Sequence, residues 1–278
     1  MPKNLCLTLT AFTTAFTLTG CGDKSASVPS HNSFIDQLKK DYPVSLAKIA
    51  DNVWVHTTNY TFPGQTPVSS NGLVVASNDD LILVDTSWGE MATLSLLESI
   101  KDQTGREVTK LIITQHHMNR IAGVDVAERK GIKVFTHPET PKLAVQNGYP
   151  VPNTSVSSLK LPKSRTRVGP VEVAYPGHGQ TLDNLVVYVP SANILYGGCA
   201  IRSAGSTNLG NIADANLKTW GPALAWVKTT YPETKTVVPC RGKGANLSLI
   251  DDTLALIAKR VNAQQTQAVE TDDTPAKP

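Results

Sequence analysis

A buried strand followed at once by a turn rich in histidine and amide side chains is the feature that most constrains this chain. Residues 111–113 form a short apolar run, and residues 114–123 read Thr-Gln-His-His-Met-Asn-Arg-Ile-Ala-Gly. The end of a strand is where α/β proteins gather their ligand-binding side chains, and a histidine-rich turn there is where a hydrolase would hold a metal ion. The sequence therefore predicts a sheet protein with its site at this turn.

The pattern of apolar residues and turn signals predicts an α/β protein. The expected strands are Val53–His56, Gly72–Ala76, Leu81–Val84, Leu111–Thr114, Lys133–Thr136, Val171–Tyr175, Leu185–Val189, Ile194–Tyr196 and Thr236–Val238. The expected helices are Glu90–Gln103, Ala122–Lys130, Leu217–Thr230 and Ser248–Gln264. Strands come first, alternating units follow, and the same order then repeats. This order predicts two central β-sheets with helices outside.

The chain divides into four predicted segments. Residues 1–20 have the charged start and apolar stretch of a secretory signal, and the sequence at 18–21, Leu-Thr-Gly-Cys, resembles the lipobox of bacterial lipoproteins. We therefore expect export to the periplasmic side of a bacterial membrane and a lipid anchor on Cys21. Gly22 favours the outer membrane. Residues 21–33 are predicted to be a tether, 34–264 the folded domain and 265–278 a disordered tail.

Charge and composition exclude some partners. The formal net charge is +3, acidic and basic residues are mixed along the chain, and 40% of the residues are hydrophobic. The sequence contains no run of basic residues that would indicate binding to nucleic acid. The hydrophobic fraction suits an ordinary globular domain.

Several stretches between residues 45 and 263 carry a family resemblance. They are residues 85–89, the turn at Gln115, residues 177–184, the run 183–200, and residues 210–215 and 231–233. Together they resemble the class B (zinc) metallo-β-lactamases. They are closest to the VIM-type enzymes, whose subclass has three His at one zinc and Asp, Cys and His at the other. The resemblance implies an αβ/βα four-layer sandwich with the site in the cleft between the two sheets.

The same resemblance implies that most zinc ligands are replaced. The positions of the six ligands fall on Gln115, His117 and Gln180 for the first zinc and on Asn119, Cys199 and Arg241 for the second. The amide oxygen of a glutamine is a weaker ligand than imidazole. Arg241 brings a fixed positive charge and no lone pair to a ligand position. We therefore expect at most one zinc ion.

The positions that contact substrate in the family match this sequence better than the zinc-ligand positions do. Asn211 falls where the family contacts the β-lactam carbonyl, and Asn119 stands where the family Asp orients the attacking water. Arg202 falls where a basic residue can hold a substrate carboxylate, and Arg241 could hold an anion. The alternatives are that Asn211 only caps the turn at residue 214 and that Arg202 is a solvated charge.

Asp85, His116 and the two cysteines at 199 and 240 carry separate expectations. Asp85 is expected to be structural, supporting the histidine turn from below. His116 is expected to be a surface histidine beside the motif. In the family frame Cys199 and Cys240 lie on the same side of the cleft. This leaves open either a disulfide between them or two reduced thiols, with Cys199 beside Arg241.

Three functions remain compatible with the sequence. The first is hydrolysis of a β-lactam or a related amide or ester with one zinc. The second is binding of an anionic small molecule, such as a β-lactam, without catalysis. The third is a hydrolase with a relocated metal site drawn from His116, His117, His178, Cys199 and Cys240. No Gly-x-Ser-x-Gly motif points to a serine nucleophile.

Overall fold

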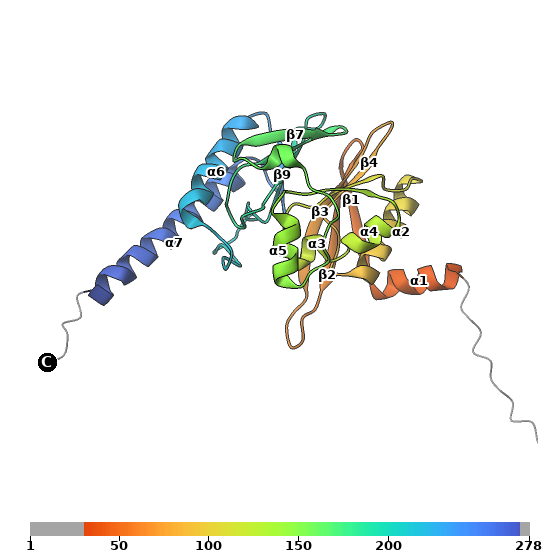
Figure 1. Ribbon diagram of the computed structural model, residues 1–278, viewed down its shortest axis with the longest axis horizontal. Helices are drawn as coiled ribbons and strands as arrows, with labels where there is room; N and C mark the ends of the chain where they lie inside the picture. Colours follow the sequence, from red (N-terminus) through yellow and green to blue (C-terminus); the bar gives the residue numbers. More distant parts are fainter. Residues whose placement is uncertain (1–30, 273–278) are drawn as a thin grey trace, which may run out of the picture.

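Two β-sheets lie face to face in the computed structural model, which describes residues 31–272, and helices cover both outer sides (Figure 1). The first sheet runs in sequence order through β1 Val44–Ala50, β2 Val53–Tyr60, β3 Val68–Ala76, β4 Leu81–Val84, β5 Lys110–Ile112 and β6 Lys133–Phe135. The second runs in the order β11 Thr236–Pro239, β10 Ile194–Gly198, β9 Val186–Val189, β8 Val171–Tyr175 and β7 Ser164–Val168. The predicted αβ/βα sandwich is confirmed.

The alternation of side chains along the strands builds the layers. On β3, Leu73 and Val75 face the second sheet, whereas Val74 faces the outer helices. On β4, Ile82 faces inward and Leu83 outward in the same way. Because successive strand residues point to opposite faces, a run that is apolar throughout is buried on both sides. These strands therefore connect the core between the sheets to the core under the helices.

Helices close both outer faces. The outer face of the first sheet packs against α2 Glu90–Thr104, α4 Val124–Arg129 and α5 Thr140–Asn147. The second sheet packs against α6 Leu217–Thr230 and α7 Ser248–Asp272. Asn216 caps α6, its side chain accepting from the backbone N–H groups of Lys218 and Thr219. This cap satisfies backbone donors in the first turn of α6.

Some elements within the domain differ from the predicted ones. The predicted helix Ala122–Lys130 is two helices, α3 Met118–Ile121 and α4, with Gly123 between them. A Cβ on Gly123 would lie 1.9 Å from Oγ1 of Thr93, so this position needs glycine for close packing on α2. The strands β1 and β7 and the helix α5 were not predicted. β1 and β7 are edge strands with many exposed side chains, and α5 has few buried residues, so their apolar patterns are weak.

Both predicted ends of the domain shift. The helix α1 His31–Asp41 begins inside the predicted tether, because Leu38 is buried and Lys39 pairs with Asp102 on α2. At the other end α7 runs through Asp272, where a disordered tail was expected from residue 265. Residues 265–272 contain no proline or glycine, so the sequence holds no signal that ends a helix there. Residues 1–30, with the predicted signal and Cys21, lie outside the described residues.

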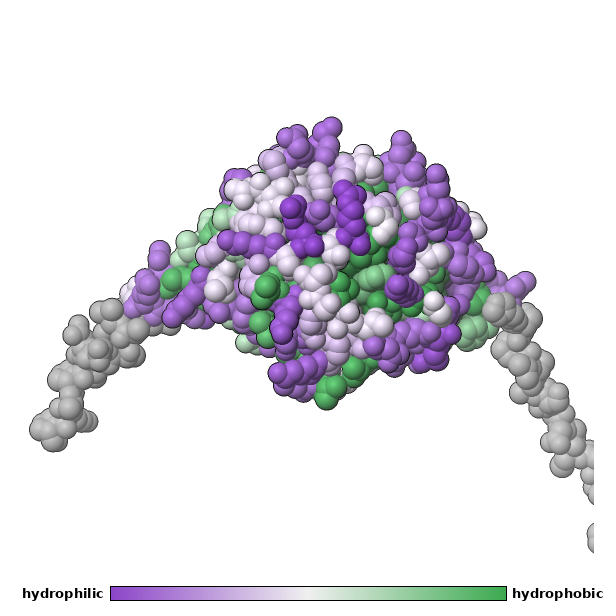
Figure 2. Space-filling view, turned by 45° about the horizontal axis from the view of Figure 1, so that its top comes forward, coloured by the Kyte–Doolittle hydropathy of each residue, from purple (hydrophilic) through white to green (hydrophobic). Residues whose placement is uncertain are grey.

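The surface is mixed in character. Hydrophilic and intermediate residues cover most of the face in Figure 2, and hydrophobic residues appear in smaller separate areas. In residues 31–272 no helix is long and apolar enough to cross a membrane.

Candidate functional site

Asp85 holds the histidine turn from below, as the sequence predicts. It follows β4 with a positive φ of 64° and is fully buried. Its carboxylate accepts from the backbone N–H of Thr114 at 2.7 Å and from Nη1 of Arg120 at 3.0 Å. The first and last parts of the turn are therefore tied to one buried charge.

Arg120 joins the two sheets behind the cleft. Its guanidinium is fully buried and donates to the carbonyl of Asn71 on β3, the hydroxyl of Tyr196 on β10 and the carbonyl of Cys240 after β11. Asn71 in turn donates to the carbonyls at 239 and 242, at 3.1 and 2.9 Å. This network fixes the loop that carries Arg241. Burial raises the pKa of the Tyr196 hydroxyl well above its ordinary value, so it stays a neutral partner.

His117 is already engaged at both ring nitrogens. Nε2 lies 2.9 Å from the carboxylate of Asp214, and Nδ1 lies 2.9 Å from the amide nitrogen of Gln115. Because a carboxylate only accepts, Nε2 carries the proton, and the lone pair of Nδ1 accepts from Gln115. Burial lowers the pKa of His117, which keeps the ring neutral. The side chain of Gln115 thus occupies the lone pair that a ligand histidine would offer.

The other two amides of the site also have protein partners. The amide nitrogen of Gln180 donates to the carbonyl of Asn211 at 2.9 Å, while its amide oxygen is buried without a partner among the described residues. Asn119 lies against the guanidinium of Arg120. Since arginine has only donors, the Asn119 oxygen faces it and accepts from Nη2 at 2.7 Å.

Cys199 and Cys240 form a disulfide, with Cα atoms 4.9 Å apart. The first of the two expected states is therefore present, and Cys240 is 3% exposed. Neither sulfur is a free thiolate for a metal ion.

Arg241 and Arg202 place two positive charges at the same cleft. The guanidinium of Arg241 lies over the ring of Trp88, 6.0 Å from its centre. Partial burial, and then the charges of Arg120 and Arg202, lower the pKa of Arg241. Among the described residues no carboxylate pairs with either Arg241 or Arg202. Arg202 instead donates to the carbonyl of Asn208 at 3.1 Å and lies against Gly210.

Asn211 caps its own turn, since its side-chain oxygen accepts from the backbone N–H of Ala213 at 3.0 Å. Of the two roles that the sequence allows for Asn211, the capping role is therefore present. Asn211 and nine other residues line one small cavity of about 100 Å³. It is lined by His117, Asn119, Gln180, Cys199, Arg202, Leu209, Gly210, Asn211, Cys240 and Arg241. Among the described residues that the sequence predicts for the site, Gln115, His116 and His178 do not line it.

His116 is a correction to the sequence analysis, because it is 2% exposed and not a surface residue. Its Nδ1 lies 3.0 Å from the carboxylate of Asp183, which also accepts from the His116 backbone N–H. Asp183 and Asp214 were not predicted as partners of the turn. Asp183 is 67 residues from His116, and Asp214 is 97 residues from His117. At such separations no local sequence pattern indicates the contact.

The family resemblance places six zinc ligands on residues 115, 117, 119, 180, 199 and 241, called here the carried-over positions. The side chains at these positions do not fit a dinuclear zinc centre. The sulfur of Cys199 is in a disulfide, Arg241 has no lone pair, and Nδ1 of His117 is hydrogen-bonded to Gln115. Zinc needs imidazole, thiolate or carboxylate ligands that are free to bind.

Comparison with known proteins gives the family. The model of the metallo-beta-lactamase superfamily matches residues 65–241. The metallo-beta-lactamase type 2 of Bacillus cereus is 39% identical over 217 residues, covering 77% of this chain and 82% of that protein. The type 2 enzyme of Bacteroides fragilis is 30% identical, covering 79% and 88%.

Solved structures agree with this match. The mono-zinc form of the metallo-beta-lactamase FIM-1 from Pseudomonas aeruginosa has a TM-score of 0.73 and 33% identity, covering 78% of this chain and 96% of that one. A metallo-beta-lactamase from Pontibacter korlensis has a TM-score of 0.71 and 36% identity, covering 77% and 99%. The chain belongs to the metallo-beta-lactamase superfamily.

Proposed function

We propose that this chain is a binding member of the superfamily, which holds an anionic small molecule in the cleft without hydrolysing it. The observation that carries the proposal is Arg241, a guanidinium at a position where the family resemblance expects a zinc ligand. A second arginine, Arg202, lines the same cavity, and no described carboxylate pairs with either side chain. Two unpaired positive charges in a partly desolvated cleft favour an anion between or above them.

Hydrolysis by the family chemistry is not supported by the donor set. A metal-bound hydroxide requires ligands that hold the ion and leave a position for water. The disulfide removes Cys199 from that set, and the fixed charge of Arg241 repels a cation. The binding alternative therefore fits the geometry better than a one-zinc hydrolase at the six carried-over positions.

The size of the cavity limits what enters it. A volume of about 100 Å³ is well below the roughly 300 Å³ at which pockets for drug-sized ligands begin. It suits one carboxylate head, which arginine can hold with two parallel hydrogen bonds. An apolar ligand body would lie on the neighbouring aromatic cluster, where Trp88 stacks on Tyr60 at 5.4 Å and meets the edge of Phe62.

The predicted export belongs to the same proposal. A lipid on Cys21 would anchor the domain to the outer membrane from the periplasmic side, where small anionic antibiotics such as β-lactams arrive. The support for this step is the signal-like sequence of residues 1–21.

Calorimetric titration with benzylpenicillin tests the proposal, because this β-lactam carries one carboxylate. We expect binding at low ionic strength with no loss of the β-lactam over hours, both with added zinc and with a chelator. Arg241→Gln should weaken binding by about tenfold to a hundredfold, the value of a hydrogen bond to a charged group. Chelator-sensitive hydrolysis, or equal affinity in the variant, would contradict the proposal.

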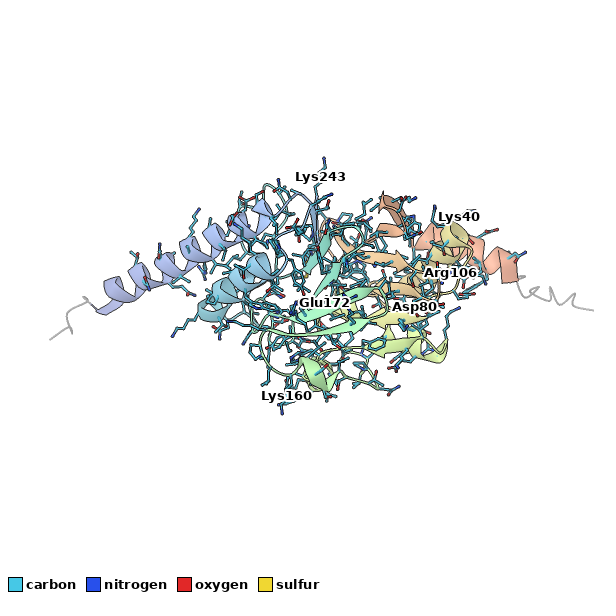
Figure 3. All side chains as sticks on the ribbon, turned by 90° about the horizontal axis from the view of Figure 1, so that it is seen from above. Lys40, Asp80, Arg106, Lys160, Glu172 and Lys243 are labelled. Carbon is cyan, nitrogen blue, oxygen red and sulfur yellow. A yellow bond between two sulfur atoms is a disulfide. The ribbon has the colours of Figure 1, made fainter. Side chains whose placement is uncertain are left out.

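Arg167→Gln is the matched control. Arg167 is an exposed arginine on β7, at the opposite edge of the second sheet from β11. Figure 3 shows Lys243, two residues after Arg241, and Lys160, just before β7, on opposite sides of the molecule. The control variant should bind benzylpenicillin as the unchanged chain does.

A further inference from the structure

We propose that His116, His117 and Asp214 form a zinc site beside the cleft, with a ligand set different from the six carried-over positions. Each residue offers one ligand atom, and the three atoms lie within 4.8 Å of one another. Two imidazoles and one carboxylate are a donor set that zinc accepts, with a fourth position left for water.

His116 is prepared as a ligand by the residue behind it. Its Nδ1 is 3.0 Å from Asp183, a buried carboxylate that also accepts from Oγ1 of Thr140 at 2.9 Å. The carboxylate keeps the ring proton on Nδ1, so Nε2 carries the lone pair. Nε2 has no hydrogen-bond partner among the described residues. A carboxylate behind a histidine is the arrangement that orients zinc ligands and makes them more basic.

His117 and Asp214 are already close to a zinc-binding separation. Their Nε2 and Oδ2 atoms are 2.9 Å apart. Tetrahedral zinc with bonds of about 2.0–2.2 Å holds two ligand atoms roughly 3.4 Å apart. Opening the contact by about half an ångström is small for Asp214, whose side chain is 45% exposed on the loop before α6.

Gln115 lets His117 change tautomer when the ion binds. Zinc at Nε2 requires the ring proton to move from Nε2 to Nδ1, with no net loss of a proton. Nδ1 then donates, and the amide of Gln115, which now donates to it at 2.9 Å, turns so that its oxygen accepts. The other end of that amide meets the hydroxyl of Thr181 at 3.5 Å, and a hydroxyl serves as donor or acceptor.

His178 has a different part in this arrangement. Its Nε2 donates to the backbone carbonyl of Asp214 at 2.9 Å, so it holds the loop and is not one of the ligands.

Equilibrium dialysis of the disulfide-intact protein against zinc tests the site. We expect one ion per chain, and we expect Asp214→Asn and His116→Gln each to weaken binding by more than about 100-fold, since loss of an outer-shell partner alone weakens binding by about 10–100-fold. The matched control is Asp125→Asn, an exposed carboxylate on α4. This variant should keep the affinity within a few-fold.

Cobalt(II) in place of zinc gives a second readout. The complex should show the visible bands of four-coordinate cobalt without the near-ultraviolet band of a thiolate ligand. A thiolate band would place the ion on Cys199 and overturn the proposal. Absence of binding, or unchanged affinity in Asp214→Asn, would overturn it equally. Asp214 is exposed, so this variant tests the site even where His116→Gln disturbs the buried pair with Asp183.

Discussion

Cys199 and Cys240, 41 residues apart in sequence, are joined by a disulfide at the neighbouring ends of β10 and β11, with Cα atoms 4.9 Å apart. The family resemblance of the sequence places a thiolate ligand at Cys199, and Cys240 directly precedes Arg241. One covalent bond therefore keeps the sulfur of Cys199 from binding a metal ion and fixes the start of the segment that brings the guanidinium into the cleft.

The disulfide predicts the thiol count. In a chain carrying Cys6→Ser and Cys21→Ser, only Cys199 and Cys240 remain of the four cysteines. After denaturation without reductant we expect no reactive thiol, and two after reduction. Two reactive thiols before reduction would rule out the bridge.

The same bridge should contribute to stability. Closing a loop of 41 residues restricts the unfolded chain, and the chain-entropy relation gives about 4 kcal/mol. We expect Cys199→Ser with Cys240→Ser to lower the free energy of unfolding by about 2–4 kcal/mol in urea titrations. Equal stability of the two proteins would contradict a closed loop in the native state.

Arg120→Met should be strongly destabilising. The change leaves Asp85 buried without its cationic partner, and breaking a buried pair in this way costs about 3–5 kcal/mol. Arg129→Ala is the control, because its pair with Glu90 is exposed and is worth about 0–1 kcal/mol. Urea unfolding of both variants measures the difference. A loss in Arg120→Met no larger than that of the control would show that the network does not hold the sheets together.

His56 makes stability depend on pH. Burial lowers its pKa from 6.5 to about 4, so it is neutral in the folded state. Between these values the unfolded chain takes up a proton that the folded chain does not, so the free energy of unfolding falls as the pH drops. The loss should approach about 3 kcal/mol. In His56→Gln the fall between pH 7 and pH 4.5 should be smaller. An unchanged pH dependence would place the titrating group elsewhere.

Restoring the family's ligands should restore its chemistry. The variant combines Gln115→His, Gln180→His, Arg241→His, Asn119→Asp and Cys240→Gly. It should bind two zinc ions and hydrolyse a β-lactam faster than the unchanged chain by several orders of magnitude, the scale of metal-ion catalysis. A folded, zinc-loaded variant without hydrolysis would show that the cleft itself has changed.

The layers of the fold were predictable because they follow from local patterns. Residues 81–84 and 111–113 are apolar throughout, as expected for strands buried on both faces. The first run forms β4, and residues 111–112 of the second lie in β5 of the same sheet. β7 escaped prediction because its residues, Ser-Arg-Thr-Arg-Val, face solvent on an edge. The division of the helix at Gly123 depends on Thr93, thirty residues away, and no local pattern reports it.

The sequence predicted which residues line the site, but not which of them are hydrogen-bonded to one another. The family resemblance brought residues 117, 119, 180, 199 and 241 to one cleft, and they line one cavity. It did not reveal that Gln115 donates to His117 or that Asp214 accepts from it, because hydrogen bonds between distant loops depend on side-chain geometry. The buried contact between His116 and Asp183 was missed for the same reason, because these two residues are also far apart in sequence.

Zinc stoichiometry tests most directly the claim that the dinuclear centre cannot form. The disulfide-intact chain is saturated with zinc, freed of excess ion and measured for zinc per chain. We expect no more than one ion per chain, and the same number in the variant Cys199→Ser with Cys240→Ser, because neither sulfur is a ligand. Two zinc ions per chain would contradict it.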